Sequence, residues 1–313
     1  MESKFSHLPD IKTIQPDRLI KYRVSEDKFS AEVLLPGLSY TDFDQKIGGK
    51  VGLWSLGKVF ESIRSVAMAT GFMYYLDLLH KPNRTLFVGG HVLTLNKDFH
   101  NIRYSNMFGR KNFLKADIYI SDVGKSSYTV ATDLYDFQSG VKLCSCKTIQ
   151  VFVDKQLRKP VPLPEEIFVG LDNHLKSVKR QTIKREKMPS IPSEAFQYEI
   201  KALHSDSDFN HHVNQAMYIK WCSDAGSLGA HKGHFSYFKR HIELYPLKSA
   251  EYQFIGETLV NDIVTVNVWE DVTVKDKVLR FAVTRSGRIV FVLKLEFYDG
   301  KPVEVLPHLE SKL

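Results

Sequence analysis

Cysteine is scarce in this sequence: its 313 residues include only Cys144, Cys146 and Cys222. So few cysteines argue against a disulfide framework and favour a reducing compartment. Cys144 and Cys146 are separated by one residue within an apparent strand, so their side chains share one face. Nothing near them supplies the usual spacing of a Cys/His metal site. We therefore interpret both as packing residues and expect no metal and no cofactor.

Long apolar runs are also missing. No apolar stretch reaches the roughly 20 residues that cross a bilayer as a helix. A secretory signal would require an apolar segment after the N-terminus, and this sequence has none there. The net charge of +7 suits an anionic partner such as the phosphates of coenzyme A. No basic stripe with interleaved aromatic residues indicates nucleic-acid binding. The sequence therefore predicts a globular protein with no membrane span and no nucleic-acid partner.

Hydrophobic periodicity indicates the same series of elements twice: a strand, a long helix and four further strands. In the first series we expect a strand at 29–35, a helix at 54–70, and strands at 86–95, 113–121, 127–135 and 141–153. In the second we expect a strand at 196–203, a helix ending near residue 227, and strands at 250–255, 262–270, 278–284 and 288–298. This repetition indicates an internal duplication.

The chain length suits two cores better than one. We expect a first unit at 26–164, a connecting segment at 165–193, a second unit at 194–305 and a tail at 306–313, after an irregular polar arm at 1–25. A helix against an antiparallel sheet in each unit gives an α+β fold. The apolar face predicted for the first helix consists of Leu56, Val59, Phe60, Ile63, Val66 and Ala67.

Residues 208–214, Asp-Phe-Asn-His-His-Val-Asn, place a carboxylate, an amide and an imidazole just before the second helix. The free N–H groups of a helix N-terminus favour negative charge, so an oxyanion can be stabilised there. Asp208 can then act as general base, nucleophile or orienting carboxylate. Asn210 can hold the substrate carbonyl or the attacking water, and His212 can shuttle a proton. Ordinary helix capping by Asp and Asn is the alternative.

This motif, Asp-x-Asn-x-His-Val-Asn followed by Tyr218 and Trp221, resembles the active-site segment of acyl-ACP thioesterases. These enzymes belong to the hotdog-fold thioesterase superfamily, with the 4-hydroxybenzoyl-CoA thioesterase-like proteins. The resemblance is specific at the motif and loose elsewhere, from about Phe29 to Asp299. It implies two tandem hotdog units, each a long helix wrapped by an antiparallel sheet, which form a pseudo-dimer within one chain and carry the catalytic motif in the second unit.

Further site residues follow from the resemblance. Glu257 is similar to a strand glutamate that activates water in some members, although its spacing to Asp262 is one residue longer than in the plant enzymes. An exposed charge at a strand end is the equal alternative. Asn214 and Tyr218 match the motif and are candidate substrate-binding residues; tying the loop to the helix and packing in the core are their alternatives, and we expect Trp221 in the core. The implied reaction is hydrolysis of an acyl-CoA or acyl-ACP thioester, while the acyl chain length and a homodimer of such chains stay open.

The first copy of the duplication carries a related segment. Residues 42–48, Asp-Phe-Asp-Gln-Lys-Ile-Gly, align without a gap with the motif, so that Asp42 and Lys46 stand opposite Asp208 and His212. The first copy would thus have kept the signal for the fold and lost the acid/base set.

Two other functions stay open. A double-hotdog 2-enoyl-CoA hydratase has the motif Asp-x-Asn-Pro-x-His, with histidine five residues after aspartate, whereas His212 follows Asp208 by four. One residue is a rotation of about 100° at a helix start, which disfavours the hydratase. A peroxisomal double-hotdog thioesterase with an Asp/Thr/Gln site does not share this motif. A non-catalytic acyl-CoA-binding protein is the alternative from a different class, because a fold does not determine a function.

The last three residues, Ser311, Lys312 and Leu313, match a peroxisomal targeting signal that an import receptor reads at the C-terminus. This signal points to acyl-CoA as the substrate, since fatty-acid degradation uses CoA esters. We therefore expect a peroxisomal protein, or a cytosolic one if the signal is not read.

Overall fold

The structure is a computed structural model that describes residues 9–11, 20–38, 43–44, 50–102, 113–183, 186–208, 211–274, 277–300 and 302. The chain divides into two compact units that alternate along the sequence. Unit 1 comprises Met1–Leu38, Val59–His91 and Gly109–Lys184, and unit 2 comprises Ser39–Lys58, Val92–Phe108 and Arg185–Leu313. The contiguous boundaries expected from the sequence stay a prediction. Below, residues 26–164 and 194–305 are called the first and second copy.

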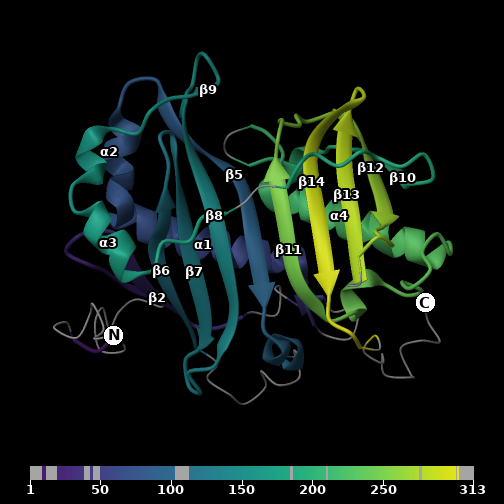
Figure 1. Ribbon diagram of the computed structural model, residues 1–313, viewed down its shortest axis with the longest axis horizontal. Helices are drawn as coiled ribbons and strands as arrows, with labels where there is room; N and C mark the ends of the chain where they lie inside the picture. The colour runs from purple at the N-terminus through teal and green to yellow at the C-terminus, as the bar shows by residue number, and fades with distance from the viewer. Residues whose placement is uncertain are drawn as a thin grey trace. The chain divides into compact units, whose positions relative to one another are not determined.

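Unit 1 contains an antiparallel sheet with the strand order β1-β2-β6-β7-β8 (Figure 1). Its strands are β1 (Lys21–Val24), β2 (Ser30–Leu35), β6 (Leu114–Val123), β7 (Ser127–Asp136) and β8 (Lys142–Asp154), and β9 (Lys159–Pro160) pairs with β8. The start of β5 (Arg84–Leu95) lies beside β8, where Arg84 forms an ion pair with Asp154. β1 lies within the segment expected to be irregular; its four residues are only half-buried, so their pattern carries little hydrophobic signal.

The long helix α1 (Leu53–Ala69) begins in unit 2 and continues into unit 1. Phe60, Ile63 and Ala67 are buried as predicted, but Val59 and Val66 are only half-buried. Arg64 is buried instead, with 6% of its surface exposed, and no hydrogen bond or ion pair joins its guanidinium to another described residue. The predicted apolar face was therefore wrong at its edges, because Arg64 lies one turn from Phe60 on the buried side.

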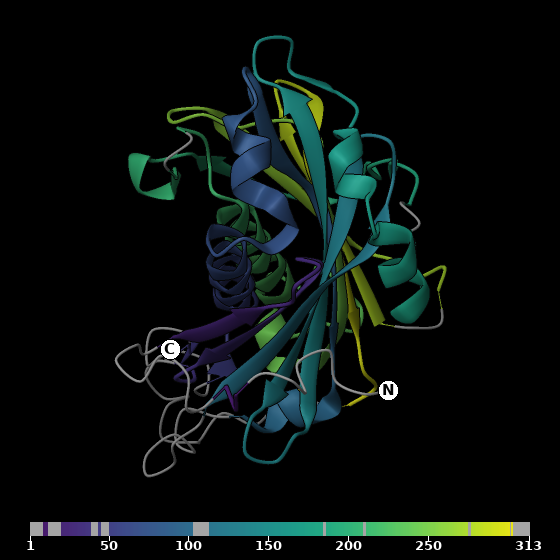
Figure 2. The same cartoon turned by 90° about the vertical axis from the view of Figure 1, so that its left-hand side faces the viewer.

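Four short helical elements follow α1 and β8 in the described part of unit 1. η2 (Phe72–Tyr74) and α2 (Tyr75–His80) come after Gly71, whose φ of 105° ends the first helix as glycine allows. η5 (Glu165–Phe168) and α3 (Leu171–Ser177) follow β9. His174 of α3 hydrogen-bonds the carbonyl of Ile120 through Nε2 at 2.8 Å. Figure 2 shows α3 on the opposite side of this sheet from α1.

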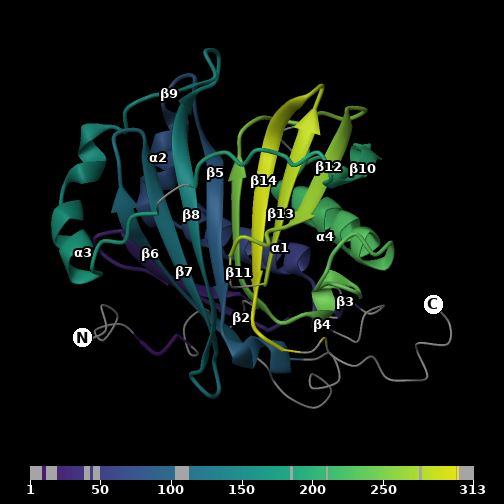
Figure 3. The ribbon, with the colours of Figure 1, turned by 45° about the vertical axis from the view of Figure 1, so that its right-hand side comes forward.

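Unit 2 contains an antiparallel sheet with the order β11-β14-β13-β12-β10. Its strands are β10 (Phe196–Lys201), β11 (Leu247–Phe254), β12 (Ile263–Glu270), β13 (Lys277–Arg285) and β14 (Arg288–Phe297). Figure 3 shows α4 (Gln215–His231) against one face of this sheet. The short elements of this unit are β3 (Phe43–Asp44), β4 (Lys50–Val51), η3 (Lys97–Asn101), η6 (His204–Asp206) and η7 (Ile242–Leu244).

The two copies have the same strand order. The first copy reads β2-β6-β7-β8-β5 across its sheet, and the second reads β10-β12-β13-β14-β11. In this correspondence α1 matches α4 and β5 matches β11. The predicted series of strand, helix and four strands is confirmed in both copies, as is the antiparallel α+β class.

Three expected absences can be compared with the described residues. Within the described ranges, no helix combines the length and the apolar character that crossing a membrane requires. The three cysteines are buried and form no disulfide. No cluster of three or more His, Cys, Asp or Glu side chains in the described part of the chain is arranged to hold a metal ion.

Candidate functional site

The loop between η6 and α4 is a tight turn that carries the motif. The amide of Asp208 donates to the carbonyl of His212 at 3.0 Å, and the amide of His211 donates to the carbonyl of Asp208 at the same distance. Ser207 and Val213 form an isolated antiparallel bridge at the base of the turn. His211 has a φ of 64°, in the left-handed region that such a turn requires. These bonds hold the two ends of the motif together.

The turn places the side chains of Asp208 and His212 close to each other. Oδ1 of Asp208 lies 3.8 Å from Nδ1 of His212, and both side chains are less than one-fifth exposed. This distance is longer than that of a hydrogen bond. Candidate acid and base groups are often this far apart when no substrate is bound. Asn210, the third candidate, lies outside the described residues. A half-buried carboxylate beside an imidazole can orient water and move a proton.

The start of α4 is held by Asn214 and Asp206. Oδ1 of Asn214 accepts the Ala216 amide at 2.9 Å, so this side chain is the helix N-cap. The carbonyl of buried Asp206 accepts the Asn214 amide at 2.8 Å, and its carboxylate accepts the Leu203 amide at the same distance. Asn214, expected from the resemblance to bind substrate, is thus placed where its oxygen orients the helix.

Glu257 lies in the loop between β11 and β12, not on a strand. Strand pairing ends just before it, because the amides of Ile255 and Gly256 both donate to the carbonyl of Val290, at 2.8 and 3.0 Å. The next residue, Thr258, accepts the amide of Val213 through its carbonyl at 2.9 Å. The loop that carries half-buried Glu257 is therefore bonded directly to the motif. The strand predicted at 250–255 ends before Glu257, and β11 likewise ends at Phe254.

Two further hydrogen bonds tie the loop after β11 to Ala202, which directly follows β10. The Ala202 amide donates to the carbonyl of Asp262 at 2.9 Å, and the Asn261 amide donates to the carbonyl of Ala202 at 2.8 Å. The carboxylate of Asp262 accepts the Leu259 amide and binds Arg285, each at 2.7 Å. The loop after β11 is thus held at both ends, which limits where Glu257 can lie.

Tyr218 and Trp221 of α4 are buried in an aromatic cluster below the motif. The ring of Tyr218 stacks on Phe291 with centroids 5.0 Å apart and contacts Trp221 and Phe254 edge-on. Burial raises the pKa of Tyr218, while its interaction with Thr258 lowers it in part. The core position predicted for Trp221 is confirmed. Tyr218 therefore packs α4 on the sheet and reaches the loop that carries Glu257.

The remaining predicted positions lie outside the described residues, and two further residues were missed. Asp42 and the targeting signal Ser311–Leu313 are among the undescribed residues. Asp206 and Thr258 were not expected, although both hold the motif in place. Asp206 had a sequence signal, an acidic residue three positions beyond the last residue of the predicted strand. Thr258 had none, because it acts through its main-chain carbonyl.

Sequence comparisons find no match, either to a family model or to a curated protein. Comparisons of structure find the same fold in thioesterases. An acyl-ACP thioesterase from Bacteroides thetaiotaomicron, 15% identical, aligns with a TM-score of 0.63 over 87% of this chain and 99% of its own. A 12:0-ACP thioesterase from Umbellularia californica, 12% identical, aligns with a TM-score of 0.62 over 90% and 98%. The shared fold thus covers nearly the full length of each of these two thioesterases.

Proposed function

We propose that this chain is an acyl thioester hydrolase and that the reaction takes place at the N-terminus of α4. The observation that carries the proposal is the approach of Asp208 to His212, 3.8 Å apart, on a loop bonded to the one that carries Glu257. The fold shared with two acyl-ACP thioesterases supports the same class of reaction. The same likeness supports two hotdog units that form a pseudo-dimer within the chain.

The chemistry follows from these groups. Asp208 or Glu257 takes a proton from a water molecule, whose oxygen attacks the thioester carbonyl. The negative oxygen that forms is stabilised by the amides of the helix N-terminus and by the amide of Asn210. The proton passes from the carboxylate to His212, and when the tetrahedral intermediate collapses, the C–S bond breaks and His212 delivers this proton to the departing thiolate. The products are a carboxylic acid and a free thiol, and no redox step is involved.

For the substrate we propose fatty acyl-CoA, and for the location the peroxisome. The net charge of +7 suits the phosphates of CoA, and an acyl-ACP substrate would suit it equally. The tripeptide Ser311–Leu313 supports the location and an import receptor as partner. Deletion of the tripeptide from a chain with an N-terminal fluorescent tag tests the location: we expect a peroxisomal signal to become cytosolic, and continued import would contradict the proposal.

The activity is tested with an acyl-CoA series from acetyl to long chain, in which a thiol reagent detects free CoA. Each ester is assayed beside its trans-2-enoyl counterpart while the enoyl absorbance is followed. We expect CoA release and a defined chain-length preference. Loss of enoyl absorbance without CoA release would identify a hydratase instead. If neither signal appears, the same assay with acyl-ACP separates a different carrier from a binding protein without activity.

A further inference from the structure

The first copy contains a structural counterpart of the motif loop. β3 and β4 pair Phe43 with Val51 just before α1, as Ser207 pairs with Val213 just before α4. Each valine lies two residues before the first residue of its helix. The two bridges therefore close the same turn in the two copies.

This pairing changes the alignment expected from the sequence. Seven residues separate the paired positions Phe43 and Val51 in the first copy, and five separate Ser207 and Val213 in the second, two fewer. Lys50, directly before the paired valine, is therefore the counterpart of His212. Lys46, which the alignment without a gap placed there, lies outside the described residues. The extra residues in the first turn explain why that alignment was out of register.

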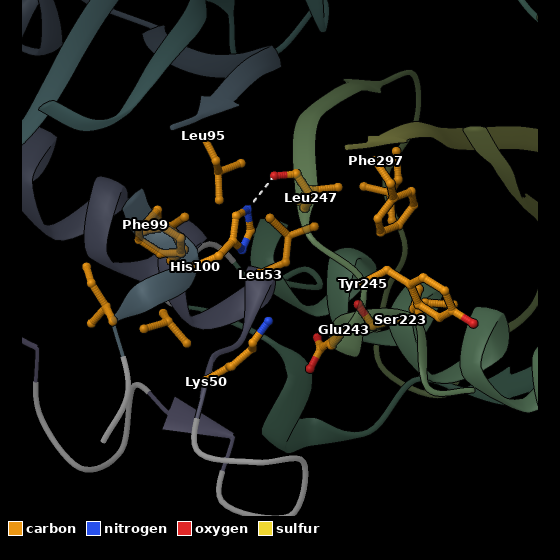
Figure 4. Close-up of a pocket in the computed structure, with 15 residues that line it drawn as sticks. Lys50, Leu53, Leu95, Phe99, His100, Ser223, Glu243, Tyr245, Leu247 and Phe297 are labelled. Atoms are coloured by element: carbon orange, nitrogen blue, oxygen red, sulfur yellow. Dashed lines mark hydrogen bonds between the residues drawn. The ribbon is translucent and has the colours of Figure 1, made fainter. Parts of the chain in front are cut away.

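A pocket lies beside this counterpart turn, entirely within unit 2 (Figure 4). Part of its space is open to solvent. It lies between the start of α1, the end of β5 with η3, and η7 with β11. Most of its wall is apolar, from Leu53, Leu56, Leu95, Phe99, Leu247 and Phe297. Such a wall suits an alkyl chain.

The polar end of the pocket carries opposite charges. Lys50 is 7% exposed, and in Figure 4 its ammonium and the carboxylate of Glu243 point toward one another. His100 Nε2 donates to the carbonyl of Leu247 at 2.7 Å, and burial lowers the pKa of His100, with a smaller effect from Lys50. The end as a whole suits an uncharged head group that both accepts and donates hydrogen bonds.

We propose that this pocket binds a second acyl thioester without hydrolysing it. The alkyl chain lies against the apolar wall, the thioester carbonyl accepts a hydrogen bond from Lys50, and an amide N–H of the pantetheine arm donates to Glu243. Binding occurs without hydrolysis because an ammonium donates hydrogen bonds but takes up no proton, so Lys50 does not replace His212. The choice of thioester rests on the proposed function, whereas the pocket and its counterpart position do not.

A free fatty acid is the competing ligand. Its carboxylate would lie beside both the Lys50 ammonium and the Glu243 carboxylate, so repulsion from Glu243 offsets the attraction to Lys50. The duplication also favours the thioester, because the pocket lies at the position that corresponds to the proposed catalytic turn.

The test uses the full chain and a 2-oxododecyl thioether of pantetheine, which keeps a carbonyl group but cannot be hydrolysed. Calorimetry is expected to find two molecules per chain. A version with a diazirine at the end of the alkyl chain is expected to label the peptides that contain residues 53–56 and 95–102. Absence of label on these peptides would overturn the proposal. Stronger labelling of the pocket by diazirine-bearing dodecanoate would also overturn it.

Variants assign the second molecule to the pocket. Lys50→Met is expected to weaken its binding by about tenfold or more, because a charged hydrogen bond is lost. Ile102→Trp at the pocket wall is expected to reduce labelling by filling space. Lys58→Met, an exposed lysine of α1 outside the pocket wall, is the control and is expected to change neither. Unchanged binding in both pocket variants would contradict the proposal.

The two proposals fail separately. If CoA is released from acyl-CoA while the pocket stays unlabelled, the hydrolase stands and the second site is rejected. If the pocket is labelled and no thioester is cleaved, the site stands as a ligand-binding site and the hydrolase is rejected.

Discussion

The amide of Val213 donates a hydrogen bond to the carbonyl of Thr258 over 2.9 Å. This bond joins the turn of Asp208 and His212 to the loop of Glu257, two segments far apart in the sequence. Because it is a main-chain bond, substitution of the catalytic candidates does not remove it. Variants of these side chains therefore report on chemistry rather than on the assembly of the site.

The imidazole of His212 is the first group to test. We expect His212→Asn to lower kcat by about 10²- to 10⁴-fold, the usual contribution of a proton-transfer group. The matched control is His211→Asn, next in sequence but exposed, and asparagine tolerates its left-handed backbone. We expect near-normal turnover in the control. Equal turnover in both variants, measured by CoA release, would remove His212 from the mechanism.

The carboxylate of Glu257 is tested in the same way. Glu257→Gln keeps the size of the side chain and removes its charge, so a group that activates water should lose at least about tenfold in kcat. Glu251→Gln on β11 is a matched control, since its side chain is one-third exposed and lies 3.9 Å from Lys294. If the two variants hydrolyse acyl-CoA at the same rate, Asp208 carries the chemistry without Glu257.

Gly226 allows α4 to approach the sheet closely. An added Cβ would lie 2.8 Å from Cδ1 of Ile242 and 3.2 Å from the ring of Phe281. We expect Gly226→Ala to lower the free energy of unfolding by about 1–3 kcal/mol through overpacking. Gly57→Ala in α1 is the control, because its Cβ would meet Ile219 at an ordinary 3.5 Å, and helix propensity should raise stability by up to about 1 kcal/mol. Urea unfolding measures both, and a stabilised Gly226→Ala would show that this approach is not tight.

Tyr128 is fully buried in unit 1, and its hydroxyl has no hydrogen-bond partner among the described residues. We expect Tyr128→Phe to leave the free energy of unfolding unchanged or to raise it by about 1 kcal/mol, because an unsatisfied polar group is removed. Tyr245→Phe is the contrasting variant. The Tyr245 hydroxyl accepts the Lys239 amide at 2.9 Å, so its loss should destabilise the protein by about 1 kcal/mol. A large loss in Tyr128→Phe would reveal a partner for this hydroxyl.

The ion pair of Asp262 with Arg285 makes stability depend on pH. Burial raises the pKa of Asp262, but the Leu259 amide and Arg285 lower it more, so the net pKa lies below 3.8. A carboxyl with a depressed pKa stabilises the fold above its unfolded pKa, and this stabilisation is lost as pH falls through the folded value. Wild type should therefore exceed Asp262→Asn in stability by a constant amount from pH 7 to about pH 5, and the difference should shrink below about pH 4. A difference independent of pH would contradict this assignment.

The order of elements could be predicted because its signal is local. Alternation in β12 to β14 and the helical spacing of Val213, Ala216, Met217 and Trp221 are properties of neighbouring residues. The edges of the buried face of α1 were less predictable. Arg64 is buried although its charge predicts exposure, and half-buried Val66 was expected in the core, because helical spacing fixes a face to within about one residue on either side.

The site could be predicted only in part. The Asp208 motif stands in one stretch of sequence, so its residues were found together. Glu257 was proposed from the resemblance alone, because nothing nearby in the sequence shows that its loop is bonded to the motif. The counterpart of His212 was misplaced because an insertion of two residues in a turn leaves no trace in hydrophobic pattern.

The sequence by itself determined the duplicated α+β order and the acid/base groups at the start of the second helix, because periodicity and motif spacing are encoded within short segments. Only the tertiary structure decided which loop meets the motif, and it placed Lys50 beside an apolar pocket. Hydrogen bonds such as Val213 to Thr258 form between residues separated by a helix and a strand. No local pattern specifies such a pairing, since it depends on how whole elements pack.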